Sequence, residues 1–295
     1  MPDPLSQLQK LTNFLDKSVG DFSSDLPGVQ TKMFNKVQLL LKELELSRGS
    51  VKASVKNLRK INRIKREIEG IMYNAKYFKD VDFFTNAFEI STDLQTGYFQ
   101  TMEKNFTTPK FIEVLKKSTM KSTKEALTGA GIQHNVVDKA TNIIQTNISQ
   151  GREFGNMVTD MRNFLTTTPE HVGALRSYAS HIVRDSINMY AAQYNQYVAD
   201  DLDMKWFVYT GDLRKTSREF CIALVKKRYV HKSEFGKVAA GKFIPKPKDM
   251  KGLKPDTKAT NFEILRGGYN CDHLLSPIGD AWIPKKLRLK YENIS

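Results

Sequence analysis

The clearest helical pattern in the sequence lies in TTPEHVGALRSYASHIVRDSINMYAAQYNQYVAD, residues 167–200. It opens with a threonine, a proline and a glutamate over 168–170, a combination typical of a helix start. The apolar residues that follow recur at steps of three and four: Val172, Leu175, Ala179, Val183, Ile187, Tyr190, Tyr194 and Val198. That spacing places them on one face of a helix, so we predict a helix from this start to about Asp200.

Helical patterns also dominate the sequence before this stretch. From about Phe34 to Met72 an apolar stripe opposes a basic face, which predicts a long amphipathic helix with Gly49 and Gly70 as candidate breaks. The stripe consists of Val51, Val55, Leu58, Ile61, Ile64, Ile68 and Ile71. We expect it to pack within the helical bundle or against a partner. Shorter helices are predicted from Thr108-Pro109 to near Gly129, over 135–149 and over 155–165.

The helical pattern ends near residue 203, and the composition of the sequence changes after it. Trp206-Phe207-Val208-Tyr209 is a short β-type run, and a segment rich in Lys, Gly and Pro extends from about 226 to 260. We therefore predict a mostly α N-terminal body, a helical bundle with long helices, followed by a small basic α+β module. The expected division is 1–106, 107–203 and 204–295.

Charge is concentrated in the last third of the chain. The net charge is +14, and residues 205–295 carry twenty basic against nine acidic side chains. Such an excess favours a polyanionic partner, most simply nucleic acid. The candidate contacts are Lys226, Lys227, Arg228, Lys232, Lys237, Lys242, Lys246, Lys248 and Lys251. The alternatives are a basic surface kept for solubility, an acidic protein partner, or a solvated loop without an ordered ligand.

Several classes of protein are excluded or disfavoured. No apolar run is long enough to span a membrane, and the N-terminus shows no secretory signal pattern. Two cysteines cannot form a disulfide framework, so we expect synthesis in a reducing cytosol. Because the sequence lacks a Walker loop, H-E-x-x-H and G-x-S-x-G, we predict that the protein is not an enzyme.

Two cysteines and two histidines lie within the basic module: Cys221, His231, Cys271 and His273. Thiolate and imidazole are the ligands that Zn²⁺ prefers, so these residues are compatible with one zinc site that would close the irregular loop. Their spacing is not that of a zinc finger. The alternatives are two buried thiols that act as small apolar side chains, or a disulfide formed on exposure to oxidant.

Four segments between about Asn147 and Ile278, a little under half of the chain, occur in a characteristic order. The first is Arg184-Asp185-Ser186 on the predicted helix, and the second is the aromatic strand. The other two contribute Asp212, Arg214, Thr216 and Cys221, then Gly267, Gly268, Asn270, Cys271, His273 and Pro277. In these residues and their order the chain resembles the phage head morphogenesis family, the Mu F-like minor head proteins.

This resemblance implies a structural minor head protein of a tailed bacteriophage. Such proteins lie in low copy number at the portal vertex inside the capsid and act in head assembly and genome packaging or delivery. The expected partners are phage portal and capsid proteins and, by nonspecific contact, double-stranded DNA. The expected location is the virion, and the host cytoplasm during assembly. The chain departs from the family pattern at Asp185-Ser186, where the family has Thr-Glu, and in the extra Lys/Pro-rich loop between the two cysteines.

Two other functions remain open at this point. A nuclease or toxin-like module could use His231 and His273 as general acid and base, with Arg218 to neutralise the phosphate. A protein-only adaptor could use the same basic surface to contact an acidic portal or capsid protein.

Overall fold

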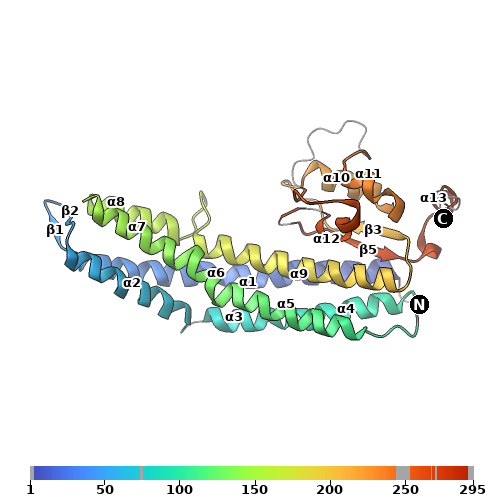
Figure 1. Cartoon of the computed structure of the whole chain (residues 1–295), viewed down its shortest axis with the longest axis horizontal. Coiled ribbons are helices and arrows are strands. Elements are labelled where there is room, and N and C mark those ends of the chain that lie inside the picture. The colour runs from blue at the N-terminus through green and yellow to red at the C-terminus, as the bar shows by residue number, and fades with distance from the viewer. Residues whose placement is uncertain (1–2, 74–75, 244–252, 267, 270, 292–295) are drawn as a thin grey trace. The chain divides into compact units, whose positions relative to one another are not determined.

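The computed structural model describes residues 3–73, 76–243, 253–266, 268–269 and 271–291 (Figure 1). The predicted fold class is confirmed, because long helices make up most of the chain and a small sheet follows near the C-terminus. The longer helices are α1 (Pro4–Leu41), α2 (Val55–Tyr73), α3 (Lys76–Thr85), α4 (Ala87–Gln100), α5 (Lys110–Thr128), α7 (Asp138–Ser149), α8 (Phe154–Leu165), α9 (Ala174–Asp201) and α10 (Glu219–Lys227). The shorter elements are α6 (Ala130–Ile132), α11 (Phe235–Ala239), α12 (Phe262–Leu265), α13 (Lys285–Leu289), and the strands β1 (Leu46–Ser47), β2 (Ser50–Val51), β3 (Trp206–Thr210), β4 (Tyr229–His231) and β5 (Leu274–Ile278).

The chain forms two compact units, each assembled from separate stretches. Unit 1 comprises Met1–Ser18, Asn86–Thr119 and Arg184–Ser295, and unit 2 comprises Val19–Thr85 and Met120–Val183. The divisions expected after residues 106 and 203 both fall within unit 1. The reason is that the C-terminal sheet packs on helices from earlier stretches. Within the described part of the chain, no helix combines the length and apolar character needed to cross a membrane.

In unit 2, the single helix predicted over 34–72 is wrong. A helix that already begins at Pro4 ends at Leu41, a β1–β2 hairpin turns at Gly49, and α2 starts only at Val55. Buried Asn57 anchors the hairpin, because its Nδ2 donates to the carbonyl oxygens of Glu45 at 3.0 Å and Lys52 at 2.8 Å. Gly70, the other candidate break, lies inside α2.

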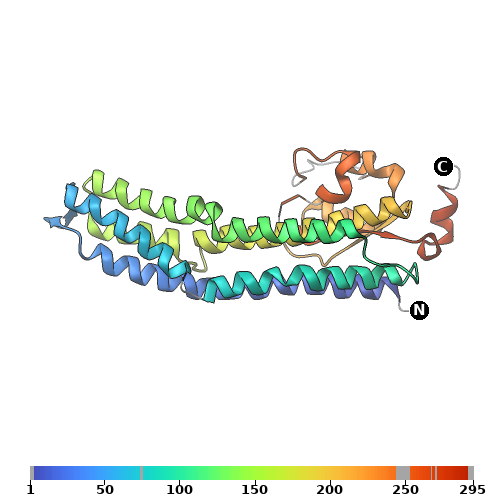
Figure 2. The same cartoon turned by 60° about the horizontal axis from the view of Figure 1, so that its bottom comes forward.

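The apolar stripe of α2 is confirmed only in its C-terminal half. Ile64 and Ile68 are 1% and 0% exposed, whereas Val55 and Leu58 are 65% and 40% exposed. Helix α2 contacts α7, and α7 contacts α8, so the three helices lie side by side (Figure 2). Within α2, burial of the apolar stripe therefore begins about two turns from the start of the helix.

The start predicted for α9 is also wrong by several residues. Thr168 does not cap a helix that starts at Pro169, because residues 167–173 form a loop in which the Thr167 hydroxyl accepts the N–H of Gly173 at 3.0 Å. The helix begins at Ala174 and ends at Asp201. The apolar positions from Leu175 to Val198 are buried as the periodicity predicts, while Val172 is 57% exposed in the loop.

Helix α9 links the helices of unit 1 to the sheet. Buried Gln95 of α4 donates to the Ala191 carbonyl at 3.0 Å and to the Asn195 side chain at 3.1 Å. Asn195 in turn donates to the hydroxyl of Ser276 in β5 at 3.0 Å. These amides satisfy one another inside the protein, which avoids the cost of burying unpaired polar groups. The chain of hydrogen bonds sets α4, α9 and β5 in register.

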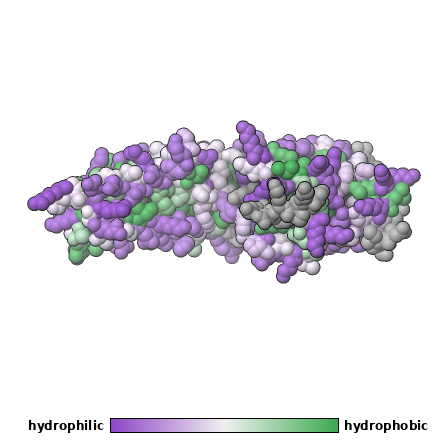
Figure 3. Space-filling view, turned by 90° about the horizontal axis from the view of Figure 1, so that it is seen from above, coloured by the Kyte–Doolittle hydropathy of each residue, from purple (hydrophilic) through white to green (hydrophobic). Residues whose placement is uncertain are grey.

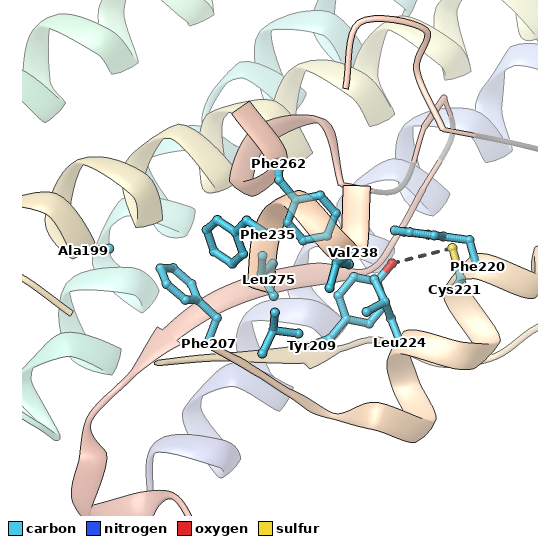
Figure 4. Close-up of a cluster of buried hydrophobic side chains, with 11 residues drawn as sticks. Ala199, Phe207, Tyr209, Phe220, Cys221, Leu224, Phe235, Val238, Phe262 and Leu275 are labelled. Atoms are coloured by element: carbon cyan, nitrogen blue, oxygen red, sulfur yellow. Dashed lines mark hydrogen bonds between the residues drawn. The ribbon is translucent and has the colours of Figure 1, made fainter. Parts of the chain in front are cut away.

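The sheet of unit 1 is antiparallel with strand order β4-β3-β5. Trp206 pairs with His231 on one side and with Ile278 on the other. One sheet face carries Phe207, Tyr209 and Leu275, which pack against apolar residues of α10, α11 and α12 (Figure 4). This small core fixes the end of β3 and the start of α10, the two places from which the site described next is built.

Candidate metal centre

Cys221, Cys271 and His273 come together at one place in unit 1. Cys221 lies in the first turn of α10, and the other two residues immediately precede β5. The two Sγ atoms are 3.9 Å apart, and Cys271 Sγ is 3.6 Å from His273 Nδ1. One ligand atom from each side chain lies within 4.8 Å of the others. The predicted clustering of these three residues is therefore present in the fold.

The spacing of the three donors fits a zinc ion. Zn–S bonds of about 2.3 Å and Zn–N bonds of about 2.0 Å in a tetrahedron place two sulfurs about 3.8 Å apart and a sulfur and a nitrogen about 3.5 Å apart. The Sγ–Sγ separation of 3.9 Å and the Sγ–Nδ1 separation of 3.6 Å match these two edges to about 0.1 Å. A disulfide would need the sulfurs to approach to about 2.05 Å, and both cysteines are free thiols here.

Hydrogen bonds within the cluster and the nearby Arg266 determine its charge. The Cys221 thiol and His273 both hydrogen-bond to Cys271, and these bonds hold the pKa of Cys271 well below its usual range. The shared hydrogen bond and burial raise the pKa of Cys221. Arg266 is 4% exposed, and its guanidinium donates to the backbone carbonyls of Glu263, Ile264 and His273. A buried cation bonded to neutral acceptors favours negative charge nearby, which the thiolate of Cys271 supplies.

Tyr209 and Gly211 hold the histidine in place. The Tyr209 ring stacks on His273 with centroids 5.2 Å apart and planes 10° apart, and its hydroxyl donates to Cys221 Sγ at 3.6 Å (Figure 4). Gly211 has φ +131°, and a Cβ there would meet His273 Cα and Cδ2 at 2.9 Å. Only glycine adopts this conformation readily and leaves room for the imidazole.

A cavity of about 240 Å³ adjoins the cluster. Two ion pairs meet at Asp272, whose carboxylate contacts Arg184 at 3.2 Å and Arg214 at 2.9 Å. Arg214 also contacts Asp16 of α1 at 2.8 Å. The full lining consists of Arg184, Asp212, Arg214, Thr216, Ser217, Arg218, Cys221, Cys271, Asp272 and His273. Three separated stretches of sequence thus build a single polar cavity.

Most of the residues predicted from the family motif line this cavity. Arg184, Asp212, Arg214 and Thr216 do so together with the cysteine–histidine cluster. Gly268 has φ +80° and lines a smaller cavity on the other side of His273. The motif residues Gly267 and Asn270 lie outside the described residues.

His231 is not part of the cluster, contrary to the prediction of one site with two histidines. It stacks on Tyr291 at 4.8 Å, and its Nδ1 is 2.8 Å from the Ser233 hydroxyl. It pairs with Trp206 at one end of β3, whereas His273 packs on Tyr209 three residues along. Three residues of strand span about 10 Å, so the two imidazoles are held apart. The geometry proposed for a histidine-pair nuclease is therefore absent from the described residues.

The predicted nucleic-acid contacts fall into three groups. Lys226, Arg228, Lys237 and Lys242 have exposed side chains. Lys227 is paired with Glu234 at 3.0 Å, and Lys232 with Asp200 at 2.6 Å, so a carboxylate already offsets each charge. Lys246, Lys248 and Lys251 lie outside the described residues. Hydrophilic side chains cover much of the face seen in Figure 3.

The residues that support the site were not predicted from the sequence. Asp272 stands between the predicted Cys271 and His273, and its role as a double ion-pair partner has no local signal. Arg266 directly precedes the Gly-Gly pair, but its burial depends on the fold. Asp16 lies far away in sequence, and nothing near it indicates a contact with Arg214. Of these residues, Gly211 alone could have been recognised, because a glycine directly after a strand often marks a place where another part of the chain approaches the backbone closely.

In comparisons with protein-family models, curated proteins and solved structures, nothing matches this chain.

Proposed function

We propose that this chain is a structural minor head protein of a tailed bacteriophage, located near the portal vertex inside the capsid. It supports head assembly and genome packaging or delivery through contacts with portal and capsid proteins and nonspecific contacts with DNA. One observation supports this proposal most strongly. The residues that resemble the Mu F-like family come from separated segments, yet Arg184, Asp212, Arg214 and Thr216 line one cavity together with the cysteine–histidine cluster.

In this proposal the cluster binds zinc and has a structural role. Cys221, Cys271 and His273 are the protein ligands, and they join the start of α10 to the segment before β5. A zinc ion there ties the ends of the Lys/Pro-rich stretch to the sheet, so its binding energy stabilises the folded module. Arg266 and Tyr209 support the ligands from the buried side.

The exposed cations of the module provide the DNA contacts. Lys226, Lys237 and Lys242 neutralise phosphates without reading base sequence, as expected of a protein beside packaged DNA. Because each neutralised phosphate releases about 0.9 counterion, affinity for duplex DNA falls steeply as salt rises.

The experiment is a binding assay of the full chain with labelled duplex DNA and RNA across a salt series, with and without EDTA. We expect intact DNA to shift, with an affinity that falls with salt. Replacement of Lys226, Lys237 and Lys242 by Gln should reduce the slope of log affinity against log salt by about 2 to 3. The matched control replaces Lys52, Lys121 and Lys139, which are exposed in unit 2, and should leave the slope unchanged.

Three outcomes would overturn parts of this proposal. Cleaved products that disappear in His273→Ala would identify a nuclease. Salt-dependent binding to a purified portal protein without any binding to DNA would identify a protein-only adaptor. A slope that both triple variants reduce equally would place the DNA contacts elsewhere on the surface.

A further inference from the structure

We propose that the cavity beside the cysteine–histidine cluster binds a phosphate group. Its lining combines three guanidinium groups, from Arg184, Arg214 and Arg218, with the hydroxyls of Thr216 and Ser217. Guanidinium groups present planar pairs of N–H donors that match the oxygens of phosphate. The volume of about 240 Å³ lies below the range of about 300–1,000 Å³ typical of sites for drug-sized ligands, and suits a small group.

Carboxylates orient Arg184 and Arg214, and a backbone carbonyl orients Arg218. Asp272 contacts Arg184 and Arg214, and Asp16 contacts a second nitrogen of Arg214. Arg218 donates to the Tyr269 carbonyl at 2.7 Å through one nitrogen. Because each guanidinium has five N–H groups, Arg184 and Arg214 have more donors than these ion pairs use. The fixed orientation lowers the entropy lost when a ligand binds.

The cavity also lies at the N-terminus of α10. Thr216, Ser217 and Arg218 precede the helix and Cys221 lies in its first turn, and all four residues line the cavity. The N-cap residue, Arg218, makes no side-chain capping bond. The first N–H groups of a helix have no partner within the helix and carry partial positive charge, which favours an anion.

His273 provides an independent observation that points to a ligand. This residue lines the cavity, its side chain is only 5% exposed, and its Nε2 is buried without a hydrogen-bond partner among the described residues. Its Nδ1 faces Cys271 Sγ at 3.6 Å. A metal ion on Nδ1 leaves the ring proton on Nε2, which then requires an acceptor. A phosphate oxygen supplies one.

A cation fits the same cavity poorly. Of the two carboxylates that line it, Asp272 is already bound by two arginines, and Asp212 is on the exposed part of the loop. The inference does not depend on a role in the phage head. Only the step at His273 uses the zinc ion of the proposed function, and the arginines and the N-terminus of α10 support the inference without it. The phosphate has two sources, free inorganic phosphate and the terminal phosphate of a nucleic acid, and the test distinguishes them.

The test measures binding of inorganic phosphate to the full chain by calorimetry, against chloride at equal ionic strength. A second arm compares a short oligonucleotide with a 5′-phosphate and the same oligonucleotide with a 5′-hydroxyl. We expect saturable phosphate binding that Arg218→Gln and Arg214→Gln each weaken about tenfold or more. Thr216→Ala, which removes no charge or ion pair, should also weaken it and serves if an arginine variant fails to fold.

The matched control is Lys286→Gln, which removes the same charge at an exposed position of α13 that does not line the cavity. We expect phosphate affinity to be unchanged in this variant. Tighter binding of the 5′-phosphate oligonucleotide, lost in Arg218→Gln, would identify a nucleic-acid end as the source, whereas equal binding of both oligonucleotides would identify free phosphate. No saturable phosphate binding to the wild type, or equal weakening in Lys286→Gln, would overturn the inference.

Discussion

At the scale of single residues, the candidate site depends on a cysteine pair and a histidine whose spacing suits a metal. The distances from Cys271 Sγ to Cys221 Sγ and to His273 Nδ1 are those of two edges of a zinc tetrahedron, and the three ligand atoms lie within 4.8 Å of one another. The Tyr209 hydroxyl donates a hydrogen bond to Cys221 Sγ, and Arg266 provides a buried positive charge nearby. A buried cation such as Arg266 is costly unless hydrogen bonds or opposite charge compensate it, and the backbone carbonyls that accept its N–H groups provide such bonds.

The first prediction concerns Cys271→Ser. Protein purified without chelator should contain about one zinc ion per chain by elemental analysis, and the variant should contain almost none. Because metal binding contributes to folding, we expect the variant to lose at least about 2 kcal/mol of unfolding free energy in urea denaturation. EDTA should destabilise the wild type and leave Cys271→Ser unaffected. Zinc-free wild-type protein that is insensitive to EDTA would contradict this prediction.

The second prediction concerns Glu263, a buried acid in α12. It is 4% exposed and its Oε1 has no hydrogen-bond partner among the described residues. Burial raises its pKa from the ordinary 4.5 to about 7. The folded state therefore holds this proton more tightly than the unfolded state, and the resulting stability is present below pH 4.5 and lost as the pH rises to about 7.

We expect Glu263→Gln to remove this dependence on pH. The free energy of unfolding of the variant relative to wild type should increase between pH 5 and pH 7.5 by up to about 3 kcal/mol. Denaturation in urea at several pH values measures the difference, and Glu219→Gln, at an exposed position of α10, is the control. A difference between variant and wild type that does not change with pH would show that Glu263 titrates normally.

The site residues that could be predicted from the sequence were those whose side chains commonly bind metal ions. Cys221, Cys271 and His273 are recognisable because few residue types bind zinc. Asp272 and Asp16 were missed because an ion pair such as Asp16–Arg214 depends on which stretches the fold brings together. His231 was assigned wrongly for the same reason, since residue type alone does not show that β3 separates it from His273.

At the scale of elements, the turn after β3 is the most constrained part of the site. Gly211→Ala should destabilise the protein by about 1 to 3 kcal/mol, because a Cβ at φ +131° meets His273 at 2.9 Å. Gly97→Ala, inside α4 with no atom within 4 Å of its added Cβ, should instead be neutral or stabilise by up to about 1 kcal/mol. Thermal or urea denaturation measures both. Equal effects of the two changes would contradict the close approach.

Helix α2 offers a matched pair of substitutions on one element. Ile64→Asp places a charge at a 1% exposed position and should cost at least about 3 kcal/mol. Leu58→Asp, at a 40% exposed position, should change stability by less than about 1 kcal/mol. Both variants can be compared by urea denaturation. If Ile64→Asp is tolerated as well as Leu58→Asp, α2 does not bury its stripe against α7.

Elements with strong periodicity were predicted well. Helices α5, α7 and α8 and strand β3 lie where the apolar spacing and the flanking Pro and Gly residues place them. The β1–β2 hairpin was not predicted, because its anchor, Asn57, reaches back from α2 to carbonyls of another segment. The start of α9 was misplaced because Thr167 bonds the Gly173 N–H in a loop, and the Thr-Pro-Glu pattern cannot distinguish the two arrangements.

At the scale of the whole molecule, the candidate site and the basic surface belong to the same unit. Unit 1 brings α9, the loop before α10 and the segment before β5 together, although long stretches of unit 2 separate its parts in sequence. Most of the net charge of +14 lies in residues 205–295, which are all within this unit. A binding function centred on unit 1, with phosphate or DNA as ligand, is consistent with both properties.

The protein composition of purified particles tests whether this chain is a component of a phage head, as we propose. Particles released after induction of a host that carries the encoding genome would be purified, separated into heads and tails, and analysed by quantitative mass spectrometry. The proposal predicts this chain in heads or head precursors, at a small fraction of the copy number of the major capsid protein. Its absence from heads and head precursors, while the intact protein remains in the host cytoplasm, would contradict the proposal.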